Sequence, residues 1–147
     1  GVDRHSKTII AMNIELLLDY CVRFYERQFI TRNEVNRDIL VRFENVLDEY
    51  FVSDRPQQIG LPSVGYCAGK LHLSPNYFGD LIKKETGRTA QEHIQMKLID
   101  LAKERVFDTG KSISEIAYEL GFKYPQHFTR LFKRIVGQTP NQYRMMN

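Results

Sequence analysis

The feature that most constrains this chain is a segment that occurs twice, fifty residues apart. The spacing is kept by Pro75, Phe78, Leu81, Lys83, Lys84, Gly87 and Thr89 in the first copy and by Pro125, Phe128, Leu131, Lys133, Arg134, Gly137 and Thr139 in the second. Such a repeat indicates one supersecondary unit used twice. In each copy, Pro followed by Phe-x-x-Leu is typical of a helix that starts at the Pro and buries one side, and the later Gly is typical of its end.

A short segment with apolar residues at helical spacing precedes each copy, namely Val64, Cys67, Ala68 and Leu71 before the first and Ile113, Ile116, Ala117 and Leu120 before the second. Two helices joined by three or four residues form a helix-turn-helix, so the sequence predicts two such units in tandem. An α-solenoid is the alternative, but solenoids usually need at least three repeats. The second unit has Gly121 at its turn, where the first has Leu71.

The rest of the chain predicts further helices and no strands, so the expected fold class is all-α. Apolar residues at helical spacing predict helices over 5–28 and 32–52, and Thr31-x-x-Glu34 fits the capping box that starts a helix. We therefore expect residues 1–52 to form an αα-hairpin that couples or dimerises. Residues 53–62 are expected to be a linker and residues 63–147 the tandem helix-turn-helix domain, with a connecting helix over 90–108.

The charge distribution favours a polyanion as the partner. The chain has a net charge of +3, but residues 63–147 carry 13 Lys and Arg against 8 Asp and Glu, whereas residues 1–62 carry 8 against 10. The basic excess lies in the half that holds the repeat, where a nucleic acid would be bound.

Several other classes of protein are not indicated. The four His and two Cys lack metal-binding spacing, and there is no Gly-rich phosphate loop or nucleophile elbow, so we expect no metal, no cofactor and no enzyme activity. No apolar run approaches the ~20 residues of a membrane span and no signal peptide is visible. We expect Cys21 and Cys67 to be reduced core thiols of a cytoplasmic protein rather than a disulfide. A first residue other than Met favours a fragment with a segment missing upstream.

The second unit offers polar side chains for base reading. If Phe128, Leu131 and Phe132 face the core, helical geometry turns Gln126, His127, Arg130 and Lys133 outward. Gln pairs with an adenine edge, Arg with the O6 and N7 atoms of guanine, and Lys with phosphate. A solvated polar face, with His127 an ordinary surface histidine, is the alternative for any single residue.

The first unit is expected to read bases less well. Its outward positions are Asn76, Tyr77, Gly79, Asp80 and Lys83. Gly79 costs helix stability of about 0.5–1 kcal/mol. Asp80 either repels phosphate, accepts from a cytosine amine, or pairs with Lys83 or Lys84 along the helix.

The connecting helix has a length suited to duplex DNA. Nineteen residues at ~1.5 Å each span ~28 Å, and successive major-groove segments on one face of B-DNA are ~34 Å apart. Two recognition helices held by such a strut would enter adjacent major-groove segments.

Residues 63–144 resemble the DNA-binding domain of the AraC/XylS transcription regulators. The resemblance rests on Ser114-Glu115-Ile116-Ala117, Leu120-Gly121-Phe122, Phe128-Thr129-Arg130-Leu131-Phe132-Lys133, Gly137, Thr139-Pro140 and Tyr143-Arg144. It implies a sequence-specific regulator that binds double-stranded DNA through the second helix of each unit. The base-reading residues that it implies are Asn76, Gly79, Asp80 and Lys83 in the first unit and Pro125, Gln126, His127, Thr129 and Arg130 in the second; Lys84, Lys133 and Arg134 are expected near phosphates.

The resemblance also implies partners beyond DNA. It implies RNA polymerase, an effector-binding or dimerisation domain upstream, and a coupling role for residues 5–52. Independently of the resemblance, two helices alone leave part of the apolar stripe of the first helix uncovered, so we expect residues 5–52 to mediate self-association, as a homodimer, or docking, with Ile9, Leu16 and Phe24 at the contact. The alternative function is a helical protein-interaction module whose basic face binds an acidic protein.

Overall fold

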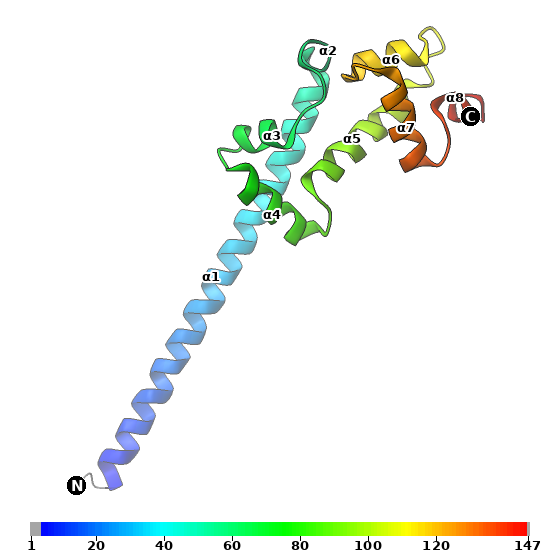
Figure 1. The fold of residues 1–147 in the computed structure, drawn as a ribbon. Helices are drawn as coiled ribbons and strands as arrows, with labels where there is room; N and C mark the ends of the chain where they lie inside the picture. Colours follow the sequence, from blue (N-terminus) through cyan, green and yellow to red (C-terminus); the bar gives the residue numbers. More distant parts are fainter. Residues whose placement is uncertain (1–3, 147) are drawn as a thin grey trace. The chain divides into compact units, whose positions relative to one another are not determined.

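The structure is a computed structural model that describes residues 4–146, apart from the side chains of residues 29 and 30. Over this range every regular element is an α-helix (Figure 1). Contacts between residues divide the chain into two units, residues 1–38 and residues 39–147, which are described separately. The helices are α1 (Arg4–Val52), α2 (Arg55–Ile59), α3 (Val64–Lys70), α4 (Pro75–Thr86), α5 (Ala90–Arg105), α6 (Ile113–Leu120), α7 (Pro125–Val136) and α8 (Pro140–Met146).

The predicted αα-hairpin is wrong, because α1 is one continuous helix of 49 residues. Thr31 was expected to cap the second helix of the hairpin. Its hydroxyl instead donates to the carbonyl oxygen of Arg27, 3.0 Å away and one turn earlier. A Thr inside a helix commonly makes this bond. The capping-box pattern therefore matches here at a position where the backbone N–H groups are already paired within the helix.

The last part of α1 belongs to the core of residues 39–147. Ile39, Phe43, Leu47 and Tyr50 are nearly inaccessible to solvent, and the ring of Phe43 meets that of Phe78 edge-on, with 4.9 Å between centroids. The contact-based division therefore falls between residues 38 and 39, inside α1.

Residues 53–62, expected to be an irregular linker, contain the short helix α2. Pro56 lies in its first turn, where Pro is tolerated because that N–H has no helical partner. The Tyr50 hydroxyl donates to the carbonyl oxygen of Gly60 at 2.6 Å, and burial is the main cause that raises the pKa of this hydroxyl. The segment is thus tied to the core through Gly60 and the buried Pro56.

Side-chain caps start most helices of the repeat. The hydroxyl oxygens of Ser74, Thr89 and Ser112 accept from the backbone N–H three residues later. Thr139 and Gln142 form a complete capping box, since each side chain accepts from the other's backbone N–H. Ser63 caps α3 in the same way. Each cap contributes about 1 kcal/mol.

The two helix-turn-helix turns are equivalent at His72 and Gly121 rather than at Leu71 and Gly121. Leu73 donates to the carbonyl oxygen of Ala68, and Phe122 donates likewise to Ala117, so these residues occupy matching places. His72 has a φ of 58° and Gly121 a φ of 106°. The first turn is one residue shorter than the second, which is why alignment on the two Pro residues pairs Gly121 with Leu71.

Helix α5 holds the two helix-turn-helix units together through a shared core. Figure 1 shows α5 between the pair α3 and α4 and the pair α6 and α7. Its inner side chains are at most 2% exposed and pack into the same cluster as α3, α4, α6 and α7: Ala90, Ile94, Leu98, Ile99 and Ala102. The helix ends at Arg105, three residues before the predicted end.

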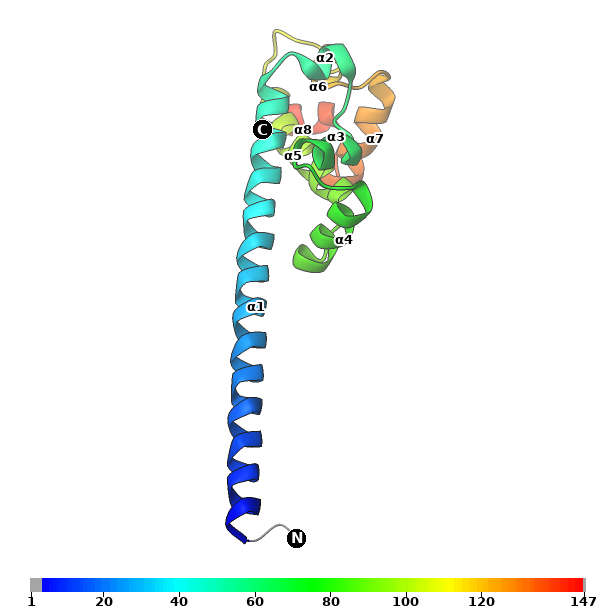
Figure 2. The ribbon, with the colours of Figure 1, turned by 90° about the vertical axis from the view of Figure 1, so that its left-hand side faces the viewer.

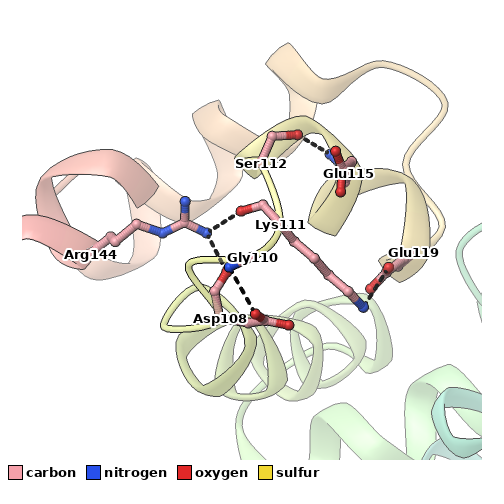
Figure 3. Close-up of polar contacts among 7 residues, drawn as sticks. All are labelled: Asp108, Gly110, Lys111, Ser112, Glu115, Glu119 and Arg144. Carbon is pink, nitrogen blue, oxygen red and sulfur yellow. Dashed lines mark hydrogen bonds and ion pairs between the residues drawn. The ribbon is translucent and has the colours of Figure 1, made fainter.

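A polar network fixes the turn between α5 and α6 (Figure 3). The Arg144 guanidinium donates to the carbonyl oxygens of Lys111 at 2.9 Å and Asp108 at 3.3 Å, and also to that of Val106. Lys111 forms an ion pair with Glu119 at 2.7 Å, and this hydrogen bond raises the pKa of Lys111. Arg144 therefore binds the carbonyl group at the C-cap of α5 and two further carbonyl groups in the loop that leads to α6.

The two cysteines are free and lie in different environments. Cys67 is completely buried, and burial raises the pKa of its thiol to about 11. Cys21 is exposed, so its predicted place in a core is wrong.

We expect Gly121→Ala to destabilise the fold. The left-handed conformation alone costs a non-Gly residue about 1–3 kcal/mol, and the added Cβ would lie 2.8 Å from the backbone carbon of Gly60. Chemical denaturation followed by circular dichroism measures the change. Gly79→Ala is the matched control, because it adds a Cβ inside α4 with no atom within 4 Å and should stabilise by about 0.5–1 kcal/mol. A Gly121→Ala variant as stable as Gly79→Ala would refute the close approach.

Candidate nucleic-acid interface

Helix α7, the second helix of the second unit, separates apolar from polar side chains cleanly. Phe128 and Phe132 are completely buried, and their rings meet edge-on with 5.8 Å between centroids. The residues on the opposite face of the helix therefore point to solvent. Gln126, His127, Arg130 and Lys133 are all exposed, as the sequence predicts, while Pro125 and Thr129 are half-buried.

The entry to α7 carries an aromatic and cationic group that sequence reasoning missed. The Tyr124 ring lies 5.3 Å from the His127 ring, and the Lys123 ammonium lies over Tyr124 at 5.6 Å from its centroid. Tyr124 is the N-cap residue of α7 but makes no side-chain cap bond. The signal available in the sequence is the unusual aromatic residue at the position where the first unit has the capping Ser74.

Helix α4, the second helix of the first unit, shows the same division. Phe78, Leu81 and Ile82 are buried. Asn76, Asp80, Lys83 and Lys84 are exposed, and Gly79 is half-buried at a point where a Cβ would meet no other atom within 4 Å.

Lys83 and Asp80 of α4, both within the described range, make no ion pair with each other in the structure. The Lys83 ammonium donates to the carbonyl oxygen of Gly87 at 2.9 Å, which satisfies the end of the helix. Among the described residues, Asp80 pairs with neither Lys83 nor Lys84. The intrahelical ion pair considered for Asp80 is therefore absent there, and the carboxylate is left facing solvent.

Arg134, expected near phosphate, contacts the connecting helix. Its guanidinium donates to the side-chain oxygen of Gln95 at 3.1 Å. His127, Arg130 and Arg134 also line one cleft together with Gln91 and Gln95 of α5. The structure thus groups three of the predicted residues of α7 around the first turns of α5.

The two recognition helices, α4 and α7, lie on one side of the body formed by residues 39–147. In Figure 2, α4 and α7 both lie to the same side of residues 39–52 of α1, and α4 packs against that segment through Phe78 and Phe43. This arrangement leaves the outward side chains of both helices open to a single extended partner. Whether each of these residues contacts DNA stays a prediction.

Two other kinds of site are absent from the described part of the chain. Over residues 4–146 no group of three or more His, Cys, Asp or Glu side chains is arranged to hold a metal ion. Over the same range no helix combines the length and the apolar character that crossing a membrane requires.

Comparison with protein families gives a match to the helix-turn-helix domain family over residues 67–146. Among curated proteins, the transposon Tn10 TetD protein of Escherichia coli is 33% identical over 144 residues, which are 97% of this chain and 91% of that protein. The bifunctional transcriptional activator and DNA repair enzyme AdaA of Bacillus subtilis is 32% identical over 70% of this chain. The chain spans 47% of the length of AdaA, and 10% of that of the transcriptional regulator YtdP of Bacillus subtilis.

Among solved structures, the C-terminal domain of the response regulator AraT from Geobacillus stearothermophilus is similar to this chain. The two are 27% identical with a TM-score of 0.64, and the match covers 74% of this chain and 85% of that domain. The repeated helix-turn-helix, the family match over more than half of the chain and the likeness to TetD along most of both proteins agree. The chain belongs to the AraC/XylS family of helix-turn-helix transcription regulators.

Proposed function

We propose that this chain binds double-stranded DNA sequence-specifically, with α4 and α7 in adjacent major-groove segments. The observation that carries the proposal is the exposed polar face of α7 over a completely buried aromatic face, because it leaves Gln126, His127 and Arg130 free to meet base edges. In a helix-turn-helix the second helix enters the major groove and its N-terminal residues contact bases.

The chemistry of the α7 face suits a mixed sequence. The Arg130 guanidinium presents a planar fork that matches guanine O6 and N7, and the Gln126 amide matches adenine N6 and N7. The half-buried Pro125 and Thr129 are placed to offer apolar surface, which suits a thymine methyl group. Lys133 and Arg134 follow on the last turns of α7 and suit phosphate oxygens, which position the protein without reading sequence.

The α4 face suits a weaker contribution to specificity. Asn76 and Lys83 supply donors, whereas Gly79 supplies no side chain and the unpaired Asp80 carboxylate repels phosphate. Lys84 occupies the repeat position of Arg134 and suits phosphate. We therefore propose that both units share the affinity and that the second unit supplies most of the base preference.

The connecting helix supports simultaneous docking. Its 16 residues span ~24 Å at ~1.5 Å per residue, and the helix lies between the two recognition helices (Figure 1). This arrangement suits the ~34 Å repeat of the major groove on one face of B-DNA.

Binding to an acidic protein is the competing function. The family match favours DNA. AdaA is named a DNA repair enzyme as well as a transcriptional activator, but this chain spans less than half of its length. We therefore propose binding without catalysis. Gel mobility shifts at moderate salt separate the two functions: a DNA-binding protein shifts a duplex and resists competition by an acidic polypeptide, whereas an acidic-protein module is competed by it.

We further propose that residues 4–28 of α1 mediate self-association, and that RNA polymerase is a partner of the DNA-bound form. Within 9–25 most apolar side chains are at least half exposed. Ile10, Ile14, Leu17, Cys21 and Phe24 follow one another at steps of four, three, four and three residues, the spacing of a coiled-coil seam. This seam includes Phe24 and runs beside Ile9 and Leu16, the other contacts expected from the sequence.

The first prediction of this proposal concerns base reading. Arg130→Ala should weaken binding to a selected duplex by about 1–3 kcal/mol and relax the preference at one base pair, because a bidentate Arg–guanine contact discriminates by that amount. Lys133→Ala is the control and should weaken all sequences alike, with the salt slope reduced by ~1. Fluorescence anisotropy on selected and scrambled duplexes measures both. Equal losses on the two duplexes for Arg130→Ala would contradict its role.

The second prediction concerns self-association. Leu17→Glu places a charge in the seam and should shift the chain to monomer in sedimentation equilibrium at micromolar concentration, because burying an unpaired carboxylate is costly. Met12→Glu is the matched control, since Met12 is equally apolar and exposed but lies outside the seam, and it should associate as the native chain does. A native chain that stays monomeric at high micromolar concentration would refute the proposal.

A further inference from the structure

Two clefts flank the first turns of α5. The first lies between α5 and α7 above an apolar floor, and its polar lining consists of Gln91, Gln95, His127, Arg130 and Arg134. The second lies beside it and is lined by Arg88, Glu92, Gln95, Met96, Arg134 and Ile135. Gln95 and Arg134 line both clefts, and their side chains are hydrogen-bonded at 3.1 Å. The two clefts therefore adjoin at this hydrogen-bonded pair, and their combined lining is called the track.

This track joins the two helix-turn-helix units. Arg88 follows Gly87, the residue at which α4 ends, and Arg130 and Arg134 belong to α7. Polar donors thus continue from the end of the first recognition helix, across α5, to the base-reading face of the second. Gln91 and Gln95 bridge the interval from successive turns of one face of α5.

The charge of the track suits an anion. Its lining contains three guanidinium groups against one carboxylate, that of Glu92. One nitrogen of Arg88 donates to the sulfur of Met96 at 2.6 Å, and a thioether is a weak acceptor. An arginine has five N–H donors, so Arg88 retains donors for a stronger acceptor such as a phosphate oxygen.

The geometry points to a phosphodiester as the ligand: we propose that Arg88, Gln91, Gln95 and Arg134, the bridging track, bind the DNA backbone where it passes between the two major-groove segments. The inference rests on the proposed function, because a duplex held by α4 and α7 must carry its intervening backbone across α5. Arg88 binds phosphate directly. Gln95 is a positioning residue, since its oxygen holds Arg134 and leaves its amide N–H₂ group free to donate to a phosphate oxygen.

The experiment uses a selected duplex in which neutral methylphosphonate linkages replace the phosphates midway between the two half-sites. The native chain should bind this duplex about tenfold more weakly than the unmodified one, as expected for loss of a charge-assisted hydrogen bond. Arg88→Ala should weaken binding to the unmodified duplex by a similar factor and lower the salt slope by ~1. The affinity of this variant should fall little further on the duplex with neutral linkages, because the two changes remove the same contact.

Two further variants keep the test independent of folding. Arg88→Lys retains the charge and should keep the salt slope of the native chain. Lys103→Ala removes a cation from the same helix at a position that lines neither cleft, and it should retain the full sensitivity to the neutral linkages. Thermal unfolding followed by circular dichroism verifies that each variant folds.

The outcomes separate this inference from the proposed function. Native binding that is unaffected by the neutral linkages, with Arg88→Ala retaining the native salt slope, would overturn the bridging track. If Arg130→Ala still loses base preference in that case, the proposed function stands without the track. A native chain that binds selected duplex no better than acidic polypeptide would overturn both.

Discussion

The structure of residues 39–147 depends on one hydrophobic core around α5, which the two helix-turn-helix units share. Leu98 and Ile99 are 1% exposed and Ala102 is completely buried, and both helix-turn-helix units pack onto this helix. Burial of apolar surface stabilises a fold by about 25 cal/mol per Å², and neither short pair of helices would bury enough apolar area to be stable alone. Because the two units share this core, the directions of α4 and α7 are set together. A partner that spans both helices therefore meets a preformed surface and loses little entropy in ordering it.

A second constraint links the segment after α1 to the second helix-turn-helix. The backbones of Gly60 and Gly121 approach so closely that a Cβ on Gly121 would lie 2.8 Å from the carbon of Gly60. Tyr50 reaches the same glycine, since its hydroxyl donates to the Gly60 carbonyl oxygen. The end of α1 and the turn before α7 are thus joined through one backbone contact. A displacement of residues 50–60 would therefore also displace the turn at Gly121, which orients the second recognition helix.

Local periodicity, with Pro at helix starts and Gly at helix ends, was sufficient to predict the helices of the repeat and the outward faces of α4 and α7. These features depend on residues three or four apart, which a sequence displays directly. Thr31 misled the prediction because its hydroxyl bonds within the helix rather than at a cap. His72 was missed because the first turn is one residue shorter than the second. The contact between Gln95 and Arg134 joins residues 39 apart in the chain, and no local pattern reveals such a pairing.

The central claim is that two recognition helices, held by one strut, read adjacent major-groove segments on the same face of a duplex. Methylation interference at guanine N7 tests it most directly, because that atom lies in the major groove. The account predicts two clusters of interfering guanines about one helical turn, ~10 base pairs, apart on one face, with the cluster under α7 the stronger. A single cluster, or two clusters on opposite faces of the duplex, would contradict it.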